Sequence, residues 1–271
     1  MLDTSIVAPI TQRFPCTLEP IDRLEDPKGS RWRIRHAKGT LTVWTWLQLP
    51  APGQPAPLKG HAVTLEIERD GLENLLVSFE HDELLPLAPL LSEACCPIPG
   101  VVRQTTDLVD RMKNPALRRF VADALLQPIA RSNFWRIPAS RLYHHPGAGG
   151  LAQHCLEIAT MIASASGLED ADRDLGIAFA LLHDYGKLEY GQPRGGGMPY
   201  VPHEKAGLIL LTPLLDRLIT EAHDCGLKMR ELLGGERAPR ANPYPLAIGK
   251  VVRAFDQLSC EANKRAHDME F

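Results

Sequence analysis

The sequence predicts an α+β protein, with a small β-rich domain over residues 1–100 and an all-α domain over residues 101–271. The first part alternates polar and apolar residues and carries many prolines, which is typical of short strands joined by loops. The second part places apolar residues three and four positions apart, which is the spacing of an amphipathic helix. A chain of 271 residues is long enough for two modest domains.

Four segments of the first part are predicted strands. Residues 31–35 alternate strictly, and residues 40–47 are rich in β-branched and aromatic residues. Residues 61–68 alternate again, and residues 75–79 follow a turn signal at Asp70-Gly71. Short strands at this spacing predict a small barrel or sandwich.

Helix signals fill the second part, after a predicted linker at residues 96–100. Asn114-Pro115 combines an N-cap residue with a first-turn proline. In residues 149–166 the apolar positions form a single stripe. The expected helices are residues 105 or 106 to 112, 114–125, 149–166, 172 or 174 to 182, 208–225, 229–233 and 246–267.

Composition excludes several classes of protein. The chain is 44% hydrophobic and 23% charged, which argues against disorder. A net charge of −3 argues against a general electrostatic coat for nucleic acid, although a local basic groove stays open. No apolar run approaches the roughly 18 residues of a membrane span, and we find no signal-peptide pattern. Six cysteines without a Cys-x-x-Cys pair are expected to be reduced, so we expect a cytoplasmic protein without a membrane partner.

Histidines and aspartates stand out in three stretches of the helical part. His154 ends the stretch HHPGAGGLAQH, and His183-Asp184 lies in ALLHDYGKLEY, at the end of an apolar helix. Asp256 lies within VVRAFDQLS. Imidazole and carboxylate ligands together suit Mn, Fe, Ni, Zn or Mg. Such a cation lowers the pKa of its bound water and clamps a phosphoryl group.

Asp184 carries the strongest physical argument for a cation. An unpaired carboxylate beside the apolar run 178–182 would be costly to bury. A divalent cation or a salt bridge to Lys187 would remove that cost.

The three stretches resemble the H…HD…D signature of the HD superfamily of metal-dependent phosphohydrolases. The first two are similar in particular to the HD domains of YhaM-type 3′→5′ exoribonucleases and of TraI-type relaxase-associated proteins of conjugative elements. The resemblance covers roughly residues 135–270 and implies an HD helical bundle. YhaM-type proteins carry an OB-fold ahead of this bundle, which is what residues 1–100 are expected to be.

The resemblance also implies roles for individual residues. One divalent metal, by preference Mn²⁺, would be held by His154, His183, Asp184 and Asp256. Asp184, Lys187 and His203 are the expected catalytic residues: Lys187 near the phosphate or paired with Asp184, and His203 as a second-metal ligand or general acid. His144 and His145 either line the substrate pocket or cap the following helix.

The sequence departs from the YhaM-type pattern at one point. Those proteins carry a His-His doublet ahead of the distal aspartate, whereas residues 230–235 contain no histidine. His223 is the only histidine between His203 and Asp256. Two interpretations therefore stay open: a centre with fewer than two metals, and an HD domain without exonuclease activity.

Basic and aromatic side chains gather in the first two predicted strands, and these are Arg31, Arg33, Arg35, Trp32, Trp44 and Trp46. On an OB-like sheet such residues bind single strands by stacking and phosphate contact. The alternative is a solvated arginine face over a tryptophan core, and alternation indeed places Trp32 opposite the arginines.

These observations predict a metal-dependent phosphodiesterase of the 3′→5′ exonuclease type, acting on single-stranded nucleic acid. One alternative is a phosphohydrolase of small nucleotides that uses the same centre. The other is a non-catalytic HD protein that handles DNA or assists partners in a conjugative element.

Overall fold

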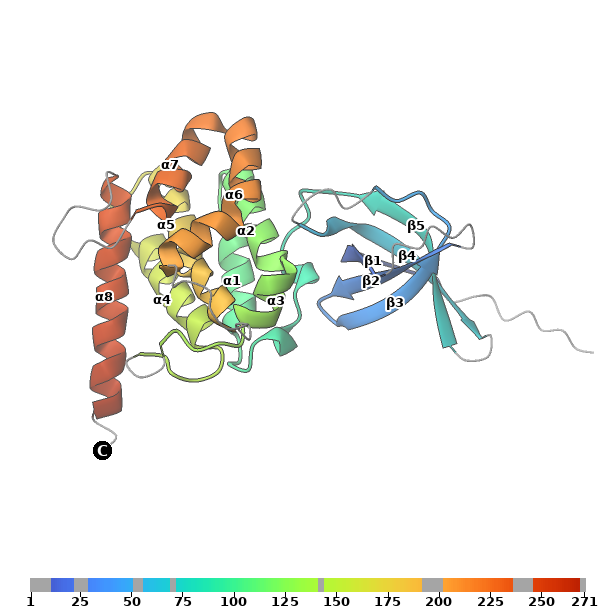
Figure 1. Cartoon of the computed structure of the whole chain (residues 1–271), viewed down its shortest axis with the longest axis horizontal. Helices are drawn as coiled ribbons and strands as arrows, with labels where there is room; N and C mark the ends of the chain where they lie inside the picture. Colours follow the sequence, from blue (N-terminus) through green and yellow to red (C-terminus); the bar gives the residue numbers. More distant parts are fainter. Residues whose placement is uncertain are drawn as a thin grey trace, which may run out of the picture. The chain divides into compact units, whose positions relative to one another are not determined.

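The chain folds into two compact units, Met1–Ser92 and Glu93–Phe271. The computed structural model describes residues 11–21, 29–50, 56–68, 72–140, 144–191, 202–235 and 246–268. Strands make up the first unit and helices the second (Figure 1), which confirms the α+β class with the β part first. The division falls after residue 92, ahead of the boundary that we predicted at residue 100.

Five strands lie in the described part of the N-terminal unit: β1 (Thr11–Pro20), β2 (Ser30–His36), β3 (Gly39–Thr45), β4 (Leu58–Glu68) and β5 (Leu72–His81). They close into a barrel in the order β1-β2-β3-β5-β4, because β1 pairs antiparallel with both β2 and β4. The sequence predicted either a barrel or a sandwich, and the structure has the barrel. The predicted turn at Asp70-Gly71 lies outside the described residues.

Alternation along the strands fills the interior of the barrel. Trp32 and Ile34 of β2 point inward, so the three arginines between and beside them point outward. Trp44 is only partly buried, and Trp46 lies beyond the end of β3 with 65% of its surface exposed. The predicted strand was therefore too long at this end. The buried core comprises Cys16, Leu18, Trp32, Ile34, Val43, Ala62 and Leu76.

The described residues of the C-terminal unit form eight α-helices: α1 (Val101–Asp110), α2 (Pro115–Leu126), α3 (Pro128–Asn133), α4 (Gly150–Ser164), α5 (Asp170–Leu182), α6 (His203–Glu221), α7 (His223–Leu233) and α8 (Ala247–Asp268). Asn114 caps α2 as predicted, because its side-chain oxygen accepts hydrogen bonds from the backbone N–H groups of Ala116 and Leu117. Among the described residues, no helix is both long and apolar enough to cross a membrane.

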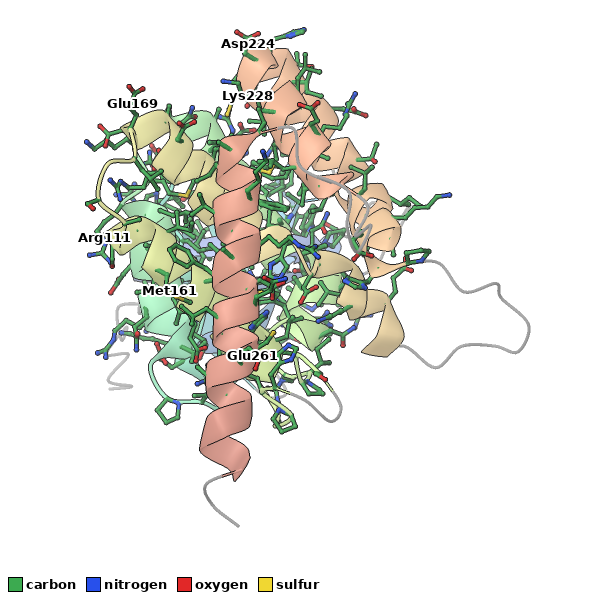
Figure 2. All side chains as sticks on the ribbon, turned by 90° about the vertical axis from the view of Figure 1, so that its left-hand side faces the viewer. Arg111, Met161, Glu169, Asp224, Lys228 and Glu261 are labelled. Carbon is green, nitrogen blue, oxygen red and sulfur yellow. The ribbon has the colours of Figure 1, made fainter. Side chains whose placement is uncertain are left out.

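Three of these helices carry the site. The predicted apolar stripe of α4, which includes Leu151 and Ile162, is fully buried and packs against α5. Helix α8 lies against both α4 and α5, and Figure 2 shows it running the length of the unit, with Glu261 in its second half. This packing brings the middle of α4, the end of α5 and the middle of α8 together.

Helix α6 begins five residues before its predicted start. His203 is therefore the first residue of a helix instead of a loop residue. Gly186 explains how that helix end comes close to the site, since a Cβ atom added there would lie only 1.8 Å from the carbonyl oxygen of His203. The predicted end of the helix over residues 208–225 is wrong. Helix α6 stops at Glu221, and α7 begins at His223.

Candidate metal centre

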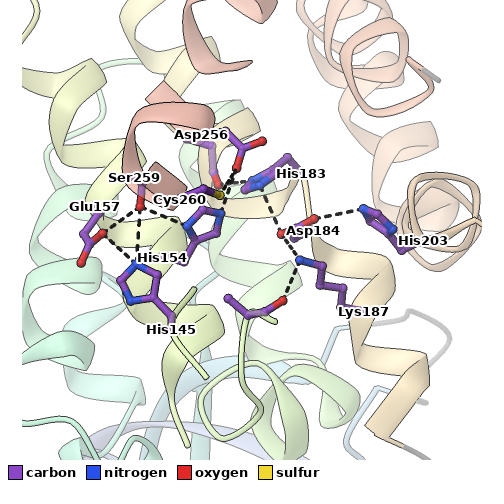
Figure 3. Close-up of polar contacts among 12 residues, drawn as sticks. His145, His154, Glu157, His183, Asp184, Lys187, His203, Asp256, Ser259 and Cys260 are labelled. Carbon is purple, nitrogen blue, oxygen red and sulfur yellow. Dashed lines mark hydrogen bonds and ion pairs between the residues drawn. The ribbon is translucent and has the colours of Figure 1, made fainter. Parts of the chain in front are cut away.

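His154, His183 and Asp256 lie together in the helical unit. Their ligand atoms all lie within 4.8 Å of one another. His154 is fully buried in α4, and its Nε2 atom is 3.1 Å from Oδ1 of Asp256 in α8. His183 is the C-cap residue of α5, where the helix ends and its side chain can turn toward the other two (Figure 3). These are three of the four metal ligands that the sequence analysis named.

Asp184, the fourth predicted ligand, is surrounded by positive and hydrogen-bonding groups. Its side chain is 1% exposed, and Nζ of Lys187 lies 2.6 Å from Oδ2. Nε2 of His183 lies 3.4 Å from Oδ2, and Nε2 of His203 lies 3.2 Å from Oδ1. Burial by itself would raise the pKa of Asp184, but Lys187 and then His183 hold it well below its usual range. Asp184 is therefore a buried anion.

Lys187 takes the predicted salt bridge to Asp184. Its ammonium group also donates a hydrogen bond to the carbonyl oxygen of Ala139 at 2.8 Å. The two contacts hold the lysine beside the carboxylate. Its charge therefore faces the same region as the histidines.

The hydrogen bonding of the imidazole nitrogens indicates whether a cation fits among these residues. Nε2 of His154, His183 and His203 is buried in each case, and none forms a hydrogen bond of acceptable geometry with the described residues. Nδ1 of His183 lies 2.8 Å from the carbonyl oxygen of Ala180, which can only accept a hydrogen bond. Nδ1 of this ring therefore carries a proton when the imidazole is neutral, leaving a lone pair on Nε2. A divalent cation would give these imidazole nitrogens a partner, so the residues fit one.

Cys260 was missed by the sequence analysis. His144, His154 and Cys260 form a second group of possible ligands within 4.8 Å. Burial and the neighbouring Asp256 raise the pKa of the Cys260 thiol to about 11, so it donates to Oδ1 of Asp256 at 3.7 Å. Its spacing of four residues from Asp256 was the available signal, since such residues share a helix face.

His144 lies at the rim of this group. Its ring centroid is 4.9 Å from that of His154. Burial, followed by the charge of His154, lowers the pKa of His144 to about 4, so its ring is neutral at pH 7. A neutral ring here is able to ligate or to contact a substrate, and the predicted substrate role stays a prediction.

A second line of polar residues lies behind His154. Ser259, Glu157 and His145 are connected there, and only His145 was among the predicted site residues. Burial favours a higher pKa for Glu157, but His145 and Ser259 together lower it below its usual value. His145 is buried. Glu157 and Ser259 were missed because a lone Glu or Ser in a helix carries no motif signal.

The three predicted substrate-binding arginines belong to the β unit. The Arg31 guanidinium lies over the ring of Trp44, 5.7 Å from its centroid. Arg35 forms an ion pair with Glu19 at 3.3 Å. Arg33 is partly exposed on the same face of β2. These residues are described within their own unit, and their role in binding stays a prediction.

Comparisons of the chain with models of protein families, with curated proteins and with solved structures found no match in any of the three. The resemblance to the HD superfamily therefore depends on the motif residues themselves.

Proposed function

We propose that the helical unit is a metal-dependent phosphoric ester hydrolase of the HD superfamily. One observation carries this proposal: His154, His183 and Asp256 converge from three helices, with the anionic Asp184 beside them. Nitrogen and carboxylate ligands of this kind suit a first-row divalent cation, with Mn²⁺ as the first candidate and Fe, Ni, Zn or Mg as alternatives. The four residues would hold it.

The remaining polar residues have roles in phosphoester hydrolysis. A bound divalent cation would supply Lewis acidity toward a phosphate oxygen and a water molecule. Lys187 would add a fixed positive charge where negative charge develops on the phosphoryl group. His203, whose side chain is 18% exposed, would protonate the leaving oxygen. Asp184 would position Lys187 and His203 through its two oxygens.

Single-stranded nucleic acid is the proposed substrate, and hydrolysis would proceed as in a 3′→5′ exonuclease. The support comes from the β unit, which we propose to be OB-like. The outer face of β2 and β3 carries Arg31, Arg33 and Trp44. The exposed Trp46 lies just after the end of β3. Aromatic rings beside cations bind single strands by stacking and phosphate contact. We place the reaction in the cytoplasm, since all six cysteines are free.

The test combines metal content with turnover. The full chain would be purified, loaded with Mn²⁺, and assayed for nucleotide release from 3′-labelled single strands and for hydrolysis of mononucleotides. We expect bound metal and turnover on strands, both lost in the double variant His183→Ala, Asp184→Ala. The control His223→Ala, an exposed histidine of α7, should keep both.

Four outcomes would contradict the proposal. Absence of bound metal, or metal retained by the double variant, would remove the metal centre. Turnover of mononucleotides alone would favour the small-nucleotide enzyme. Metal without turnover would favour the non-catalytic accessory protein, which the missing His-His doublet suggests.

A further inference from the structure

We infer that Ser259, Glu157 and His145 are positioning residues that hold His154 in the tautomer whose Nε2 lone pair faces the cation. The inference rests on the proposed function, because the cation is the one proposed above. It concerns residues outside the H…HD…D signature.

The three residues form a continuous chain of contacts that begins at His154 (Figure 3). Nδ1 of His154 lies 3.2 Å from Oγ of Ser259. The Ser259 hydroxyl donates to Oε2 of Glu157 at 2.9 Å. Nε2 of His145 lies 3.0 Å from that same carboxylate oxygen. Ser259 is 4% exposed, so its hydroxyl must find its partners inside the protein.

Proton counting then assigns the tautomer of His154. The Ser259 hydroxyl has a single proton, and an ionised carboxylate can only accept. A hydrogen bond to a charged acceptor is the stronger one, so this proton goes to Glu157. Oγ is left as the acceptor for His154, which must donate from Nδ1. A neutral His154 with its proton on Nδ1 has its lone pair on Nε2, the atom that faces Asp256.

The far end of the network is fixed in turn. Gln153 donates to the other oxygen of Glu157 at 3.1 Å. The backbone N–H of His145 donates to Oδ1 of Asn263 at 2.7 Å. His145 has a φ angle of +43°, a strained conformation for a residue other than glycine. A Cβ atom on Gly150 would lie 2.0 Å from the carbonyl oxygen of His145, so α4 packs tightly against this strained residue.

The network also connects the two helices that supply metal ligands. His154 and Glu157 lie one turn apart on α4, and Asp256 and Ser259 lie one turn apart on α8. The hydrogen bond from Ser259 to Glu157 therefore joins α4 to α8 directly behind the ligand pair. Residues that orient a ligating histidine in this way typically change metal affinity by about 10- to 100-fold when they are removed.

The experiment measures Mn²⁺ affinity of the full chain by chelator competition, together with ¹⁵N NMR of histidine-labelled, metal-free protein. Ser259→Ala should weaken Mn²⁺ binding by about 10- to 100-fold and remove the Nδ1–H signature of His154. Ser259→Thr keeps the hydroxyl and should restore both. Thr106→Ala deletes a buried hydroxyl of α1 that is hydrogen-bonded to Arg103 and should change neither readout.

Two results would overturn the inference. One is wild-type affinity in folded Ser259→Ala, and the other is a wild-type His154 ring protonated on Nε2. If the wild type binds no Mn²⁺, the proposed function fails, while the NMR readout on metal-free protein still judges the tautomer. Thermal unfolding of each variant separates loss of the network from loss of the fold.

Discussion

Asp184 is the residue on which the site depends, because a buried carboxylate must be compensated. Lys187 supplies one positive charge at 2.6 Å, and His183 and His203 lie beside the same carboxylate. Removal of one partner of a buried ion pair leaves an uncompensated charge, which costs several kcal/mol. A bound cation would compensate the same charge. Lys187 and the metal are therefore expected to stabilise the fold through the same group.

Replacement of Lys187 tests this sharing of charge. We expect Lys187→Met to lower the free energy of unfolding of the metal-free protein by about 3 kcal/mol. Mn²⁺ should recover more stability in this variant than in the wild type, because the cation then replaces the lost charge. Urea unfolding with and without Mn²⁺ measures both quantities. Equal metal-free stability of variant and wild type would show that Asp184 does not need the lysine.

At the residue scale, the motif predicted residues that the structure brings together and missed the polar residues in contact with them. His154, His183 and Asp256 do come together, and Lys187 and His203 both contact Asp184. Glu157, Ser259 and Cys260 became visible only once α4 and α8 were placed side by side. Their positions depend on helix register and on long-range packing, which single residue types in a sequence do not encode.

At the scale of elements, η3 (Tyr185–Gly191) carries Lys187 and meets the start of α6, which carries His203. The contact is backbone to backbone at Gly186, where a side chain would collide with the carbonyl group of His203. The absence of a side chain here is thus what lets His203 reach Asp184.

Gly186→Ala should separate these two elements. We expect lower thermal stability and a fall in turnover of at least about tenfold, since a displacement of about 1 Å at a catalytic group can cost about 100-fold. Gly147→Ala is the matched control, because an added Cβ there meets no atom within 4 Å. If Gly186→Ala behaves like Gly147→Ala, the close approach does not position His203.

The junction between α2 and α5 makes a prediction about pH. Asp174 is buried and accepts the backbone N–H of Asn114, the N-cap residue of α2, at 2.6 Å. Burial raises the pKa of Asp174 above its usual 3.8. Its protonated form is therefore favoured by folding, and its stabilising contribution is present at low pH and lost as pH rises through the folded-state pKa.

Asp174→Asn removes this titration while keeping an acceptor oxygen. The free energy of unfolding of the variant, minus that of the wild type, should rise as pH increases from 3.8 and then level off above the folded-state pKa. Urea unfolding at a series of acidic pH values measures the difference. A constant difference across this range would contradict the raised pKa.

Strand β1 shows where pattern-based prediction of elements fails. Its sequence contains Pro15 and Pro20, and prolines within a run argue against a strand. The strand forms because it pairs on both sides, with β2 and with β4. Tertiary pairing over about forty intervening residues outweighed the local signal, as it commonly does in sheets.

At the scale of the whole molecule, sequence pattern predicted a β part followed by a helical part. It left a barrel and a sandwich as alternatives, because closure depends on the pairing of β1 with β4, far apart in the chain. The net charge of −3 is a sum over the whole chain and does not show where positive and negative side chains gather. Arginines gather on one face of β2, while the helical unit buries the carboxylate of Asp184.

The two units are expected to divide binding from chemistry. Trp46→Ala should weaken binding of a single strand by about 5- to 150-fold, the range that corresponds to about 1–3 kcal/mol for one stacked base. Hydrolysis of a small phosphodiester should stay unchanged, since the helical unit is intact. Fluorescence anisotropy and a colorimetric assay measure the two effects. Leu84→Ala, also exposed in the β unit, is the control, and equal strand binding by all three proteins would refute this division.

The proposed function requires one divalent cation held among His154, His183, Asp184 and Asp256. The most direct measurement is anomalous diffraction at the manganese edge from crystals of the full chain grown with Mn²⁺. We predict a peak within bonding distance of Nε2 of both histidines and of the two carboxylates. An Mn²⁺-saturated crystal without a peak among these residues would contradict the account.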